Sequence, residues 1–152
     1  MKIVLKSLQK IIKINNSSLK KLIEEICKFL NLDNFCISFV FVDSQFIRKL
    51  NKKYLGKDSP TDVLAFDLKD RLTSLNLLGE IFISVEEAKR NSKIFSTDIR
   101  EELLLYIIHG LLHLIGFKDK TTSQRMRMRK KEREVLSYIF KEEKKNISSL
   151  FS

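Results

Sequence analysis

The sequence contains few of the residues that interrupt regular structure or cross-link a chain. Its 152 residues include one proline, four glycines, two cysteines and no tryptophan. So little proline and glycine argues against long irregular linkers. Cys27 and Cys36 form no CxxC pair and lie among apolar residues, so we expect two reduced, packed cysteines in a cytosolic protein.

Long hydrophobic runs are also absent. No segment reaches the roughly 18 uninterrupted apolar residues that a membrane-spanning helix requires. The nearest run, Leu103–Phe117, contains two histidines and a glycine, and we expect a core helix there. The N-terminal segment Met1–Ile14 is interrupted by lysines, which is not typical of a signal peptide. We therefore expect a cytoplasmic protein without a membrane partner.

The composition is that of a globular, strongly basic domain. Hydrophobic residues make up 43% and charged residues 32% of the chain, which suits one domain over residues 1–145, with a frayed tail over 146–152. The formal net charge of +10 favours a polyanionic partner such as RNA. A base composition that favours lysine codons would explain part of this charge.

Hydrophobic patterns predict an α+β fold. They indicate a mixed sheet of about four strands with about five helices packed on it. The predicted strands cover residues 2–5, 35–42, 63–66 and 78–84, and the predicted helices cover residues 19–30, 44–54, 85–95, 99–115 and 122–144. A polar loop is expected over residues 70–76.

The only two histidines of the chain lie four residues apart, in the stretch IHGLLHLIGFKDK. On a helix this spacing places His109 and His113 on one face, where both imidazoles can reach one cation. Two hydrogen-bonded core histidines would give the same pattern. Gly110 occupies the place of the glutamate in the HExxH motif of zinc peptidases, which argues against that mechanism.

A third ligand is expected just after the histidine helix. Gly116 can adopt positive φ and end the helix, so the chain can fold back toward the pair. Of the two candidates, Lys118 would have to lose a proton beside a dication, whereas the carboxylate of Asp119 is a normal zinc ligand. The predicted metal site is therefore His109, His113 and Asp119, although a surface aspartate paired with a lysine is the alternative for Asp119.

Three stretches resemble the motifs of the YbeY family of bacterial ribosomal RNA maturation factors. His109–Phe117 (HGLLHLIGF) matches the family signature HGxLHLxGF/Y at each fixed position. Ser59–Phe66 resembles the family's PTDVLSF motif, and Leu78–Ser84 resembles its LGD/EIxIS/C strand. The resemblance extends from about Leu50 to Asp119, and it is specific because the matches occur in register.

The resemblance implies a small α+β fold with one zinc ion held by three histidines. It implies a metal-dependent endoribonuclease that cleaves single-stranded RNA in a bacterial cytoplasm. It also implies a role in ribosomal RNA maturation and ribosome quality control, with ribosomal RNA and the ribosome or its proteins as partners. We accordingly expect one divalent ion, Zn²⁺, as the cofactor.

The third ligand is where the sequence first departs from the family pattern. A gapless alignment places Asp119 where the family usually has its third histidine, which gives a His-His-Asp site. With one inserted residue, Lys120 would replace that histidine and the third ligand would be missing. We prefer the gapless alignment because it keeps a ligand. An anionic ligand lowers the net charge of the site, so the metal should be a weaker Lewis acid and its identity is less constrained.

Leu55 is the second departure, because the family typically has an arginine there that is thought to act near the scissile phosphate. Lys52, Lys53 or Lys57 could supply positive charge from nearby, but none of them is a bidentate phosphate clamp as arginine is.

A basic segment follows the predicted metal loop. Arginines and lysines cluster between Arg125 and Arg133, beside an apolar stripe that includes Met128 and Val135. A solvated helix face, or a helix on an anionic membrane surface, would give the same pattern. Because RNA is the expected substrate, we predict phosphate contacts here. The predicted RNA-binding residues are Lys53, Lys57, Arg125, Arg127 and Arg129.

Two function classes remain open at this point. One is a metal-dependent endoribonuclease without an assigned catalytic residue, in which Asp62 is a candidate general base whose alternative role is to cap a turn. The other is a ribosome- or rRNA-binding assembly factor with weak or no nuclease activity.

Overall fold

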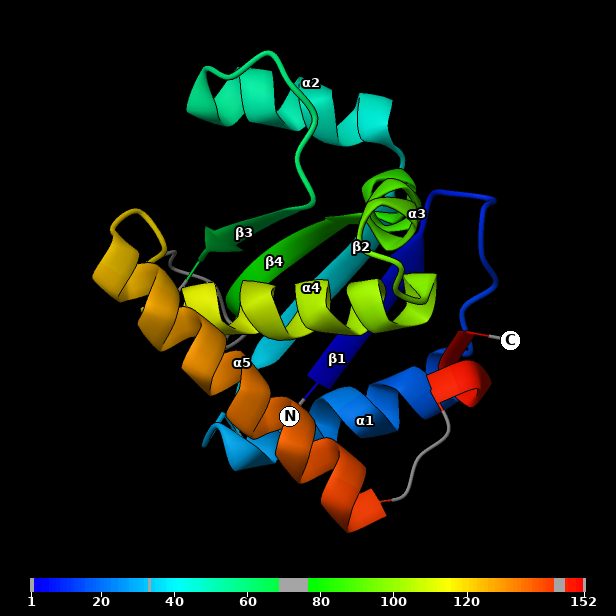
Figure 1. Cartoon of the computed structure of the whole chain (residues 1–152), viewed down its shortest axis with the longest axis vertical. Helices are drawn as coiled ribbons and strands as arrows, with labels where there is room; N and C mark the ends of the chain where they lie inside the picture. The colour runs from blue at the N-terminus through cyan, green and yellow to red at the C-terminus, as the bar shows by residue number, and fades with distance from the viewer. Residues whose placement is uncertain (1, 33, 69–76, 144–146, 152) are drawn as a thin grey trace.

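A four-stranded sheet with helices packed against it forms the part of the chain described by the computed structural model, residues 2–32, 34–68, 77–143 and 147–151 (Figure 1). The strands are β1 (Lys2–Ser7), β2 (Cys36–Val42), β3 (Val63–Asp67) and β4 (Leu77–Ser84). The helices are α1 (Asn16–Phe29), α2 (Ser44–Leu55), α3 (Val85–Ile94), α4 (Ile99–Leu114), α5 (Thr122–Glu143) and the 3₁₀-helix η1 (Ile147–Phe151). The predicted α+β fold is confirmed. The loop predicted over residues 70–76 lies outside the described residues.

The sheet is mixed, in the order β1-β2-β4-β3. β1 and β4 run parallel to β2, and β3 pairs antiparallel with β4. The first parallel pair follows from α1, which crosses over between β1 and β2 as parallel neighbours require. The turn-rich segment that follows α2 leads into β3, which pairs with the edge of β4 opposite to β2.

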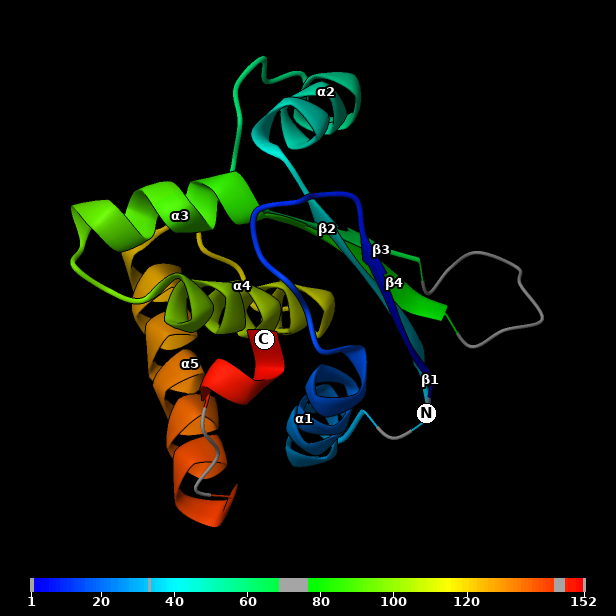
Figure 2. The same ribbon diagram turned by 90° about the vertical axis from the view of Figure 1, so that its right-hand side faces the viewer.

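Alternating side chains of β2 divide the apolar residues between the two faces of the sheet. Phe39 and Phe41 are fully buried in the main core, whereas Val40 and Val42 belong to a smaller cluster with Ile47 of α2. Figure 2 shows α1, α4 and α5 together on one side of the sheet, with α2 set apart from them. The strand predicted over residues 35–42 therefore contributes side chains to two apolar clusters, one on each face of the sheet.

Two glycines allow α4 to lie close to the sheet. A Cβ atom at Gly110 would come within 2.7 Å of Cγ2 of Ile81 on β4. A Cβ atom at Gly79 would come within 2.5 Å of the Phe66 carbonyl oxygen and within 2.6 Å of a methyl group of Leu114. Because such distances are shorter than van der Waals contact, a side chain at either position would force α4 or its neighbours to shift.

The C-terminal residues correct one prediction. The tail was expected to fray from residue 146, but residues 147–151 form η1, and Leu150 and Phe151 are each only 2% exposed. The Leu150 carbonyl oxygen accepts a hydrogen bond from the Asn15 backbone N–H at 2.8 Å. Burial of two large apolar side chains against the main core outweighs the fraying expected of a short polar tail.

Candidate metal centre

The histidine pair lies on the face of α4 near its C-terminal end. His109 and His113 are one helical turn apart, and their Nε2 atoms are 3.0 Å from each other. Their side chains are 23% and 28% exposed, so both rings are largely buried but reachable from solvent. The predicted arrangement of both imidazoles on one helix face is therefore what the structure shows.

The chain turns back after α4 and brings Asp119 to this pair. Gly116 has a φ of +104° and follows the C-cap residue Ile115. The Gly116 N–H donates to the His113 carbonyl oxygen at 3.1 Å, and the Phe117 N–H donates to the Leu112 carbonyl oxygen at 3.0 Å. These two bonds form a Schellman motif, which ends the helix and reverses the chain.

Asp119 completes a cluster of three ligand atoms. Its Oδ2 atom lies 3.3 Å from Nε2 of His109 and 3.3 Å from Nε2 of His113. One ligand atom from each residue lies within 4.8 Å of the others, so the three residues could hold a metal ion. Donor atoms about 2.0–2.2 Å from a tetrahedral ion are about 3.3–3.5 Å apart, close to the observed separations.

The second nitrogen of each imidazole has a hydrogen-bond acceptor as its partner. Nδ1 of His113 is 3.0 Å from the Phe117 carbonyl oxygen, and Nδ1 of His109 is 2.7 Å from Oε1 of Glu132 on α5. Because a carbonyl and a carboxylate only accept, both Nδ1 atoms carry a proton, and in the neutral form of each ring Nε2 presents a lone pair. Two lone pairs and a carboxylate oxygen that converge on one point repel each other, and a bound cation relieves that repulsion. The chemistry of this donor set fits a divalent metal.

The charges around His109 also favour a cation. Burial lowers the pKa of His109, but the hydrogen bond and charge of Glu132, with the charges of Asp62 and Asp119, together raise it above its ordinary value. The surroundings of this imidazole therefore stabilise positive charge.

Glu132 belongs to the candidate site, although the sequence analysis did not identify it. It is 9% exposed, although it lies in the basic segment of α5. A signal was present in the sequence, because Glu132 shares the helical spacing of the buried residues Met128, Val135 and Ile139. A carboxylate on the buried stripe of a helix needs a partner, and here the partner is His109 of the candidate metal site.

The three ligands lie between two clefts. The larger, about 600 Å³, is lined by His113 and Asp119 together with Lys57 and Leu55. The smaller, about 220 Å³, is lined by His109 and Asp119. Its remaining lining residues are Asp62, Leu105, Tyr106, Arg125, Met128, Arg129 and Glu132. Asp119 thus stands on the boundary between the two clefts.

Asp62 lies in the smaller cleft and also caps a turn. Its Oδ1 atom accepts hydrogen bonds from the Val63 N–H at 2.8 Å and the Thr61 hydroxyl at 3.3 Å. Both roles weighed from the sequence are therefore compatible with its position. In the same cleft, burial raises the pKa of Tyr106, with a further contribution from the charge of Asp62, and the Tyr106 hydroxyl accepts a hydrogen bond from Nδ2 of Asn91 at 2.7 Å.

The structure places the five predicted RNA-binding residues differently. Lys57 lines the larger cleft, and Arg129 lines the smaller one. Arg125 also lines the smaller cleft, but its Nη1 donates to the carbonyl oxygens of Lys120 at 2.8 Å and Asp119 at 3.4 Å, so it supports the ligand loop. Arg127 lines a separate hollow, and Lys53 lies with its Nζ 5.2 Å from the ring centroid of Tyr54.

Of the lysines near Leu55, Lys57 is the one at the cleft. Lys52 lies 3.9 Å from Asp58, which Arg48 also contacts at 2.8 Å, and Lys53 lies over Tyr54. Lys57 is therefore the best-placed substitute for the arginine expected at Leu55.

No helix in the described ranges is both long and apolar enough to cross a membrane.

Comparisons with known proteins point to one family. The family model for endoribonuclease YbeY matches residues 4–139. Curated proteins named endoribonuclease YbeY include one from Christiangramia forsetii, 40% identical over 107 residues (70% of this chain and 73% of the relative). Another, from Persephonella marina, is 33% identical over 141 residues (91% of this chain and 88% of the relative). The solution structure of TM1509 from Thermotoga maritima superposes with a TM-score of 0.63 at 28% identity, covering 91% of this chain and 89% of that one.

Proposed function

Because the chain belongs to the endoribonuclease YbeY family, we propose that it is a metal-dependent endoribonuclease that cleaves single-stranded RNA. The observation that carries the metal requirement is the convergence of two imidazole lone pairs and one carboxylate oxygen, with both tautomers set by hydrogen bonds. We propose His109, His113 and Asp119 as the ligands and Zn²⁺ as the ion.

The ligand residues and their supports have separate tasks in this mechanism. His109 and His113 would hold the ion through their Nε2 atoms. The hydrogen bonds of Nδ1 with Glu132 and with the Phe117 carbonyl oxygen keep the two rings in the required orientation. Arg125 holds the backbone that carries Asp119. A divalent ion in this site supplies positive charge to a phosphate oxygen and lowers the pKa of a bound water.

The remaining cleft residues act on the RNA strand and on the proton. Lys57 and Arg129, one in each cleft, hold backbone phosphates on the two sides of the ligand cluster. Asp62, in the smaller cleft, accepts the proton of the attacking water. The products are two RNA fragments, since hydrolysis breaks one phosphorus–oxygen bond of the backbone and water supplies the new one.

The substrate in the cell is proposed to be ribosomal RNA, with a role in its maturation and in ribosome quality control. The net charge of +10 suits such a polyanion, and the ribosome or its proteins would be the partners. The proposed location is the bacterial cytoplasm.

A second candidate function is rRNA binding with weak or no cleavage. Leu55 at the larger cleft, where the family typically has an arginine, favours this reading, as does the anionic ligand Asp119. Both changes reduce the positive charge available to the developing phosphorane.

Metal content and cleavage, measured on the same preparations, test the proposal. We expect about one metal ion per chain for the wild type, and loss of both the ion and the cleavage of a structured rRNA fragment in His113→Ala and Asp119→Ala. Glu101→Ala, at an exposed position in the first turn of α4, is the control and should behave as the wild type. Metal retained by Asp119→Ala would exclude the His-His-Asp site, and RNA binding without metal-dependent cleavage by the wild type would favour the second function.

A further inference from the structure

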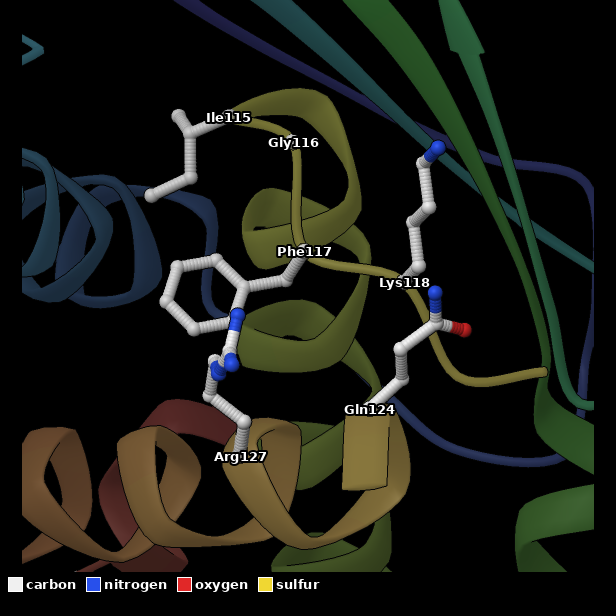
Figure 3. A pocket seen from close by; sticks show the side chains of 6 residues that line it. All are labelled: Ile115, Gly116, Phe117, Lys118, Gln124 and Arg127. Atoms are coloured by element: carbon white, nitrogen blue, oxygen red, sulfur yellow. The ribbon is translucent and has the colours of Figure 1, made fainter. Parts of the chain in front are cut away.

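A third hollow lies beside the metal loop, on the surface between that loop and α5. Its volume is about 240 Å³. Its lining residues are Ile115, Gly116, Phe117, Lys118, Gln124 and Arg127 (Figure 3). Gly116, Phe117 and Lys118 also line the larger cleft that contains His113 and Asp119. The hollow and the metal cluster are therefore separated only by the chain reversal after α4.

The polar side chains of this hollow present hydrogen-bond donors. Oε1 of Gln124 accepts from the backbone N–H groups of Lys120 at 3.0 Å and Thr121 at 3.1 Å, which fixes the amide and leaves its NH₂ group for a ligand. Lys118 and Arg127 contribute an ammonium and a guanidinium, and among the described residues no carboxylate pairs with either. Such a site fits a ligand that carries negative charge and hydrogen-bond acceptors.

An aromatic face accompanies these donors. The Phe117 ring is half-buried and lines the same hollow as Arg127, while Figure 3 draws Lys118 and Gln124 to the other side of the ring. The Phe117 carbonyl oxygen accepts from Nδ1 of His113, so the residue that carries this ring is tied to the metal site. Proteins bind single-stranded RNA with this combination, because an aromatic ring can stack on a base while cationic side chains contact a phosphate.

We propose that this hollow is a nucleotide subsite. It binds one nucleotide of the substrate strand next to the cleavage position, with the base against Phe117, its acceptors toward Gln124, and a phosphate between Lys118 and Arg127. The inference rests on the proposed endoribonuclease function and adds to it a specific place where the strand is held. An acidic peptide could pair its carboxylates with Lys118 and Arg127, but it has no base to stack on the Phe117 ring.

Arg127→Ala tests the phosphate contact, with Arg133→Ala as the control for charge. Both arginines are exposed on α5, but Arg133 does not line the hollow. Equilibrium binding of a fluorescent single-stranded oligoribonucleotide with non-cleavable linkages is measured on the metal-loaded protein, so that no cleavage occurs. We expect Arg127→Ala to weaken binding about ten-fold at moderate salt and to reduce the slope of log affinity against log salt by about 0.7. Equal effects of the two variants would overturn the assignment.

Two further variants test the donor and the ring. Gln124→Glu keeps an oxygen for the Lys120 and Thr121 N–H groups but replaces the free NH₂ by a carboxylate oxygen, and Phe117→Leu removes the ring while it keeps an apolar side chain. Each should weaken RNA binding about five- to one-hundred-fold, while metal content stays at the wild-type level. Wild-type RNA affinity in both variants would show that no nucleotide occupies the hollow. Competition by polyglutamate as strong as that by RNA would instead assign it to an acidic peptide.

The failure of this inference is distinguishable from the failure of the proposed function. A wild-type protein that does not cleave RNA contradicts the function. A wild-type protein that cleaves RNA, but whose affinity is insensitive to Arg127, Gln124 and Phe117, contradicts only the subsite.

Discussion

At the scale of single residues, the carboxylate of Glu132 on α5 orients a histidine of the candidate metal site on α4. In the described part of the chain, this carboxylate is the only side-chain partner of Nδ1 of His109. It belongs to α5 and lies 23 residues further along the chain. Its negative charge raises the affinity of the imidazole for a cation and fixes the ring plane. If His109 binds a metal as proposed, Glu132 would position that ligand without being one itself.

Removal of Glu132 should weaken metal binding rather than the fold alone. We expect Glu132→Ala to lower metal affinity about 10- to 100-fold, and Glu132→Gln to have a smaller effect because its amide oxygen still accepts from Nδ1. Competition with a chelating dye measures the affinity. Glu134→Ala, which removes an exposed carboxylate that contacts Lys131 at 3.1 Å, is the control. Unchanged metal affinity in Glu132→Ala would contradict the positioning role.

The sequence named the three candidate metal ligands that the structure brings together, but not the residues that contact them. His109 and His113 were identified because their spacing depends only on the helix, and Asp119 because Gly116 reverses the chain within a few residues. Glu132 and the loop-binding role of Arg125 depend on how α5 docks against α4, and no local pattern encodes that packing. Contacts between residues that are far apart in the sequence therefore could not be predicted.

Close contact between α4 and β4 is the element-scale feature that positions the histidines. Gly110 follows His109 directly, and its missing Cβ allows the helix to rest on Ile81. In the sequence, Gly110 argued against a peptidase, and a glycine beside His109 also leaves room for a bulky ligand or a neighbouring backbone to come close. The structure gives this glycine a packing role as well.

Gly110→Ala should destabilise the fold even though alanine favours helices. The new methyl group would lie 2.7 Å from Cγ2 of Ile81, and we expect a loss of about 1–3 kcal/mol in the free energy of unfolding. Urea unfolding measures this loss. In an Ile81→Ala background the same substitution should cost less, because the smaller side chain makes room for it. Additive costs in the two backgrounds would show that the contact with Ile81 is not the cause.

Strands and helices were predicted well because each has a local signal. Five of the seven residues of β2 are β-branched or aromatic, and α2 and α5 begin at short polar side chains of the type that favours N-caps. Asp43 accepts from the Phe46 N–H at 2.8 Å, and Thr121 accepts from the Gln124 N–H at 3.1 Å. Sheet order has no such signal, since it depends on which strand edges meet after the helices pack.

At the scale of the whole molecule, the C-terminal 3₁₀-helix closes the core. Its Leu150 and Phe151 side chains belong to the same hydrophobic core as Ile3 of β1. A frayed tail was predicted because the segment is short and follows a charged stretch. The burial of these two side chains depends on a surface formed by distant helices, which a local pattern does not reveal.

Phe151→Ala and Phe140→Ala form a matched pair that tests this closure. Phe151 is 2% exposed and Phe140 is 43% exposed. We expect Phe151→Ala to lower the free energy of unfolding by about 3–5 kcal/mol, the usual range for a buried phenylalanine, and Phe140→Ala to lower it by about 1 kcal/mol or less. Chemical denaturation of both variants measures the difference. Similar losses would indicate that the tail is not part of the stable core.

The location of the metal cluster across a helix end and a chain reversal links the ion to the stability of the whole molecule. In the unfolded chain, nothing holds Asp119 near the two histidines or Glu132 near His109. An ion that binds only the folded chain stabilises it by mass action, by about 2.7 kcal/mol when the free ion is 100-fold above its dissociation constant. The melting temperature of this protein should therefore be a measure of metal supply, so that a cell short of the ion would hold fewer folded copies as well as fewer active ones.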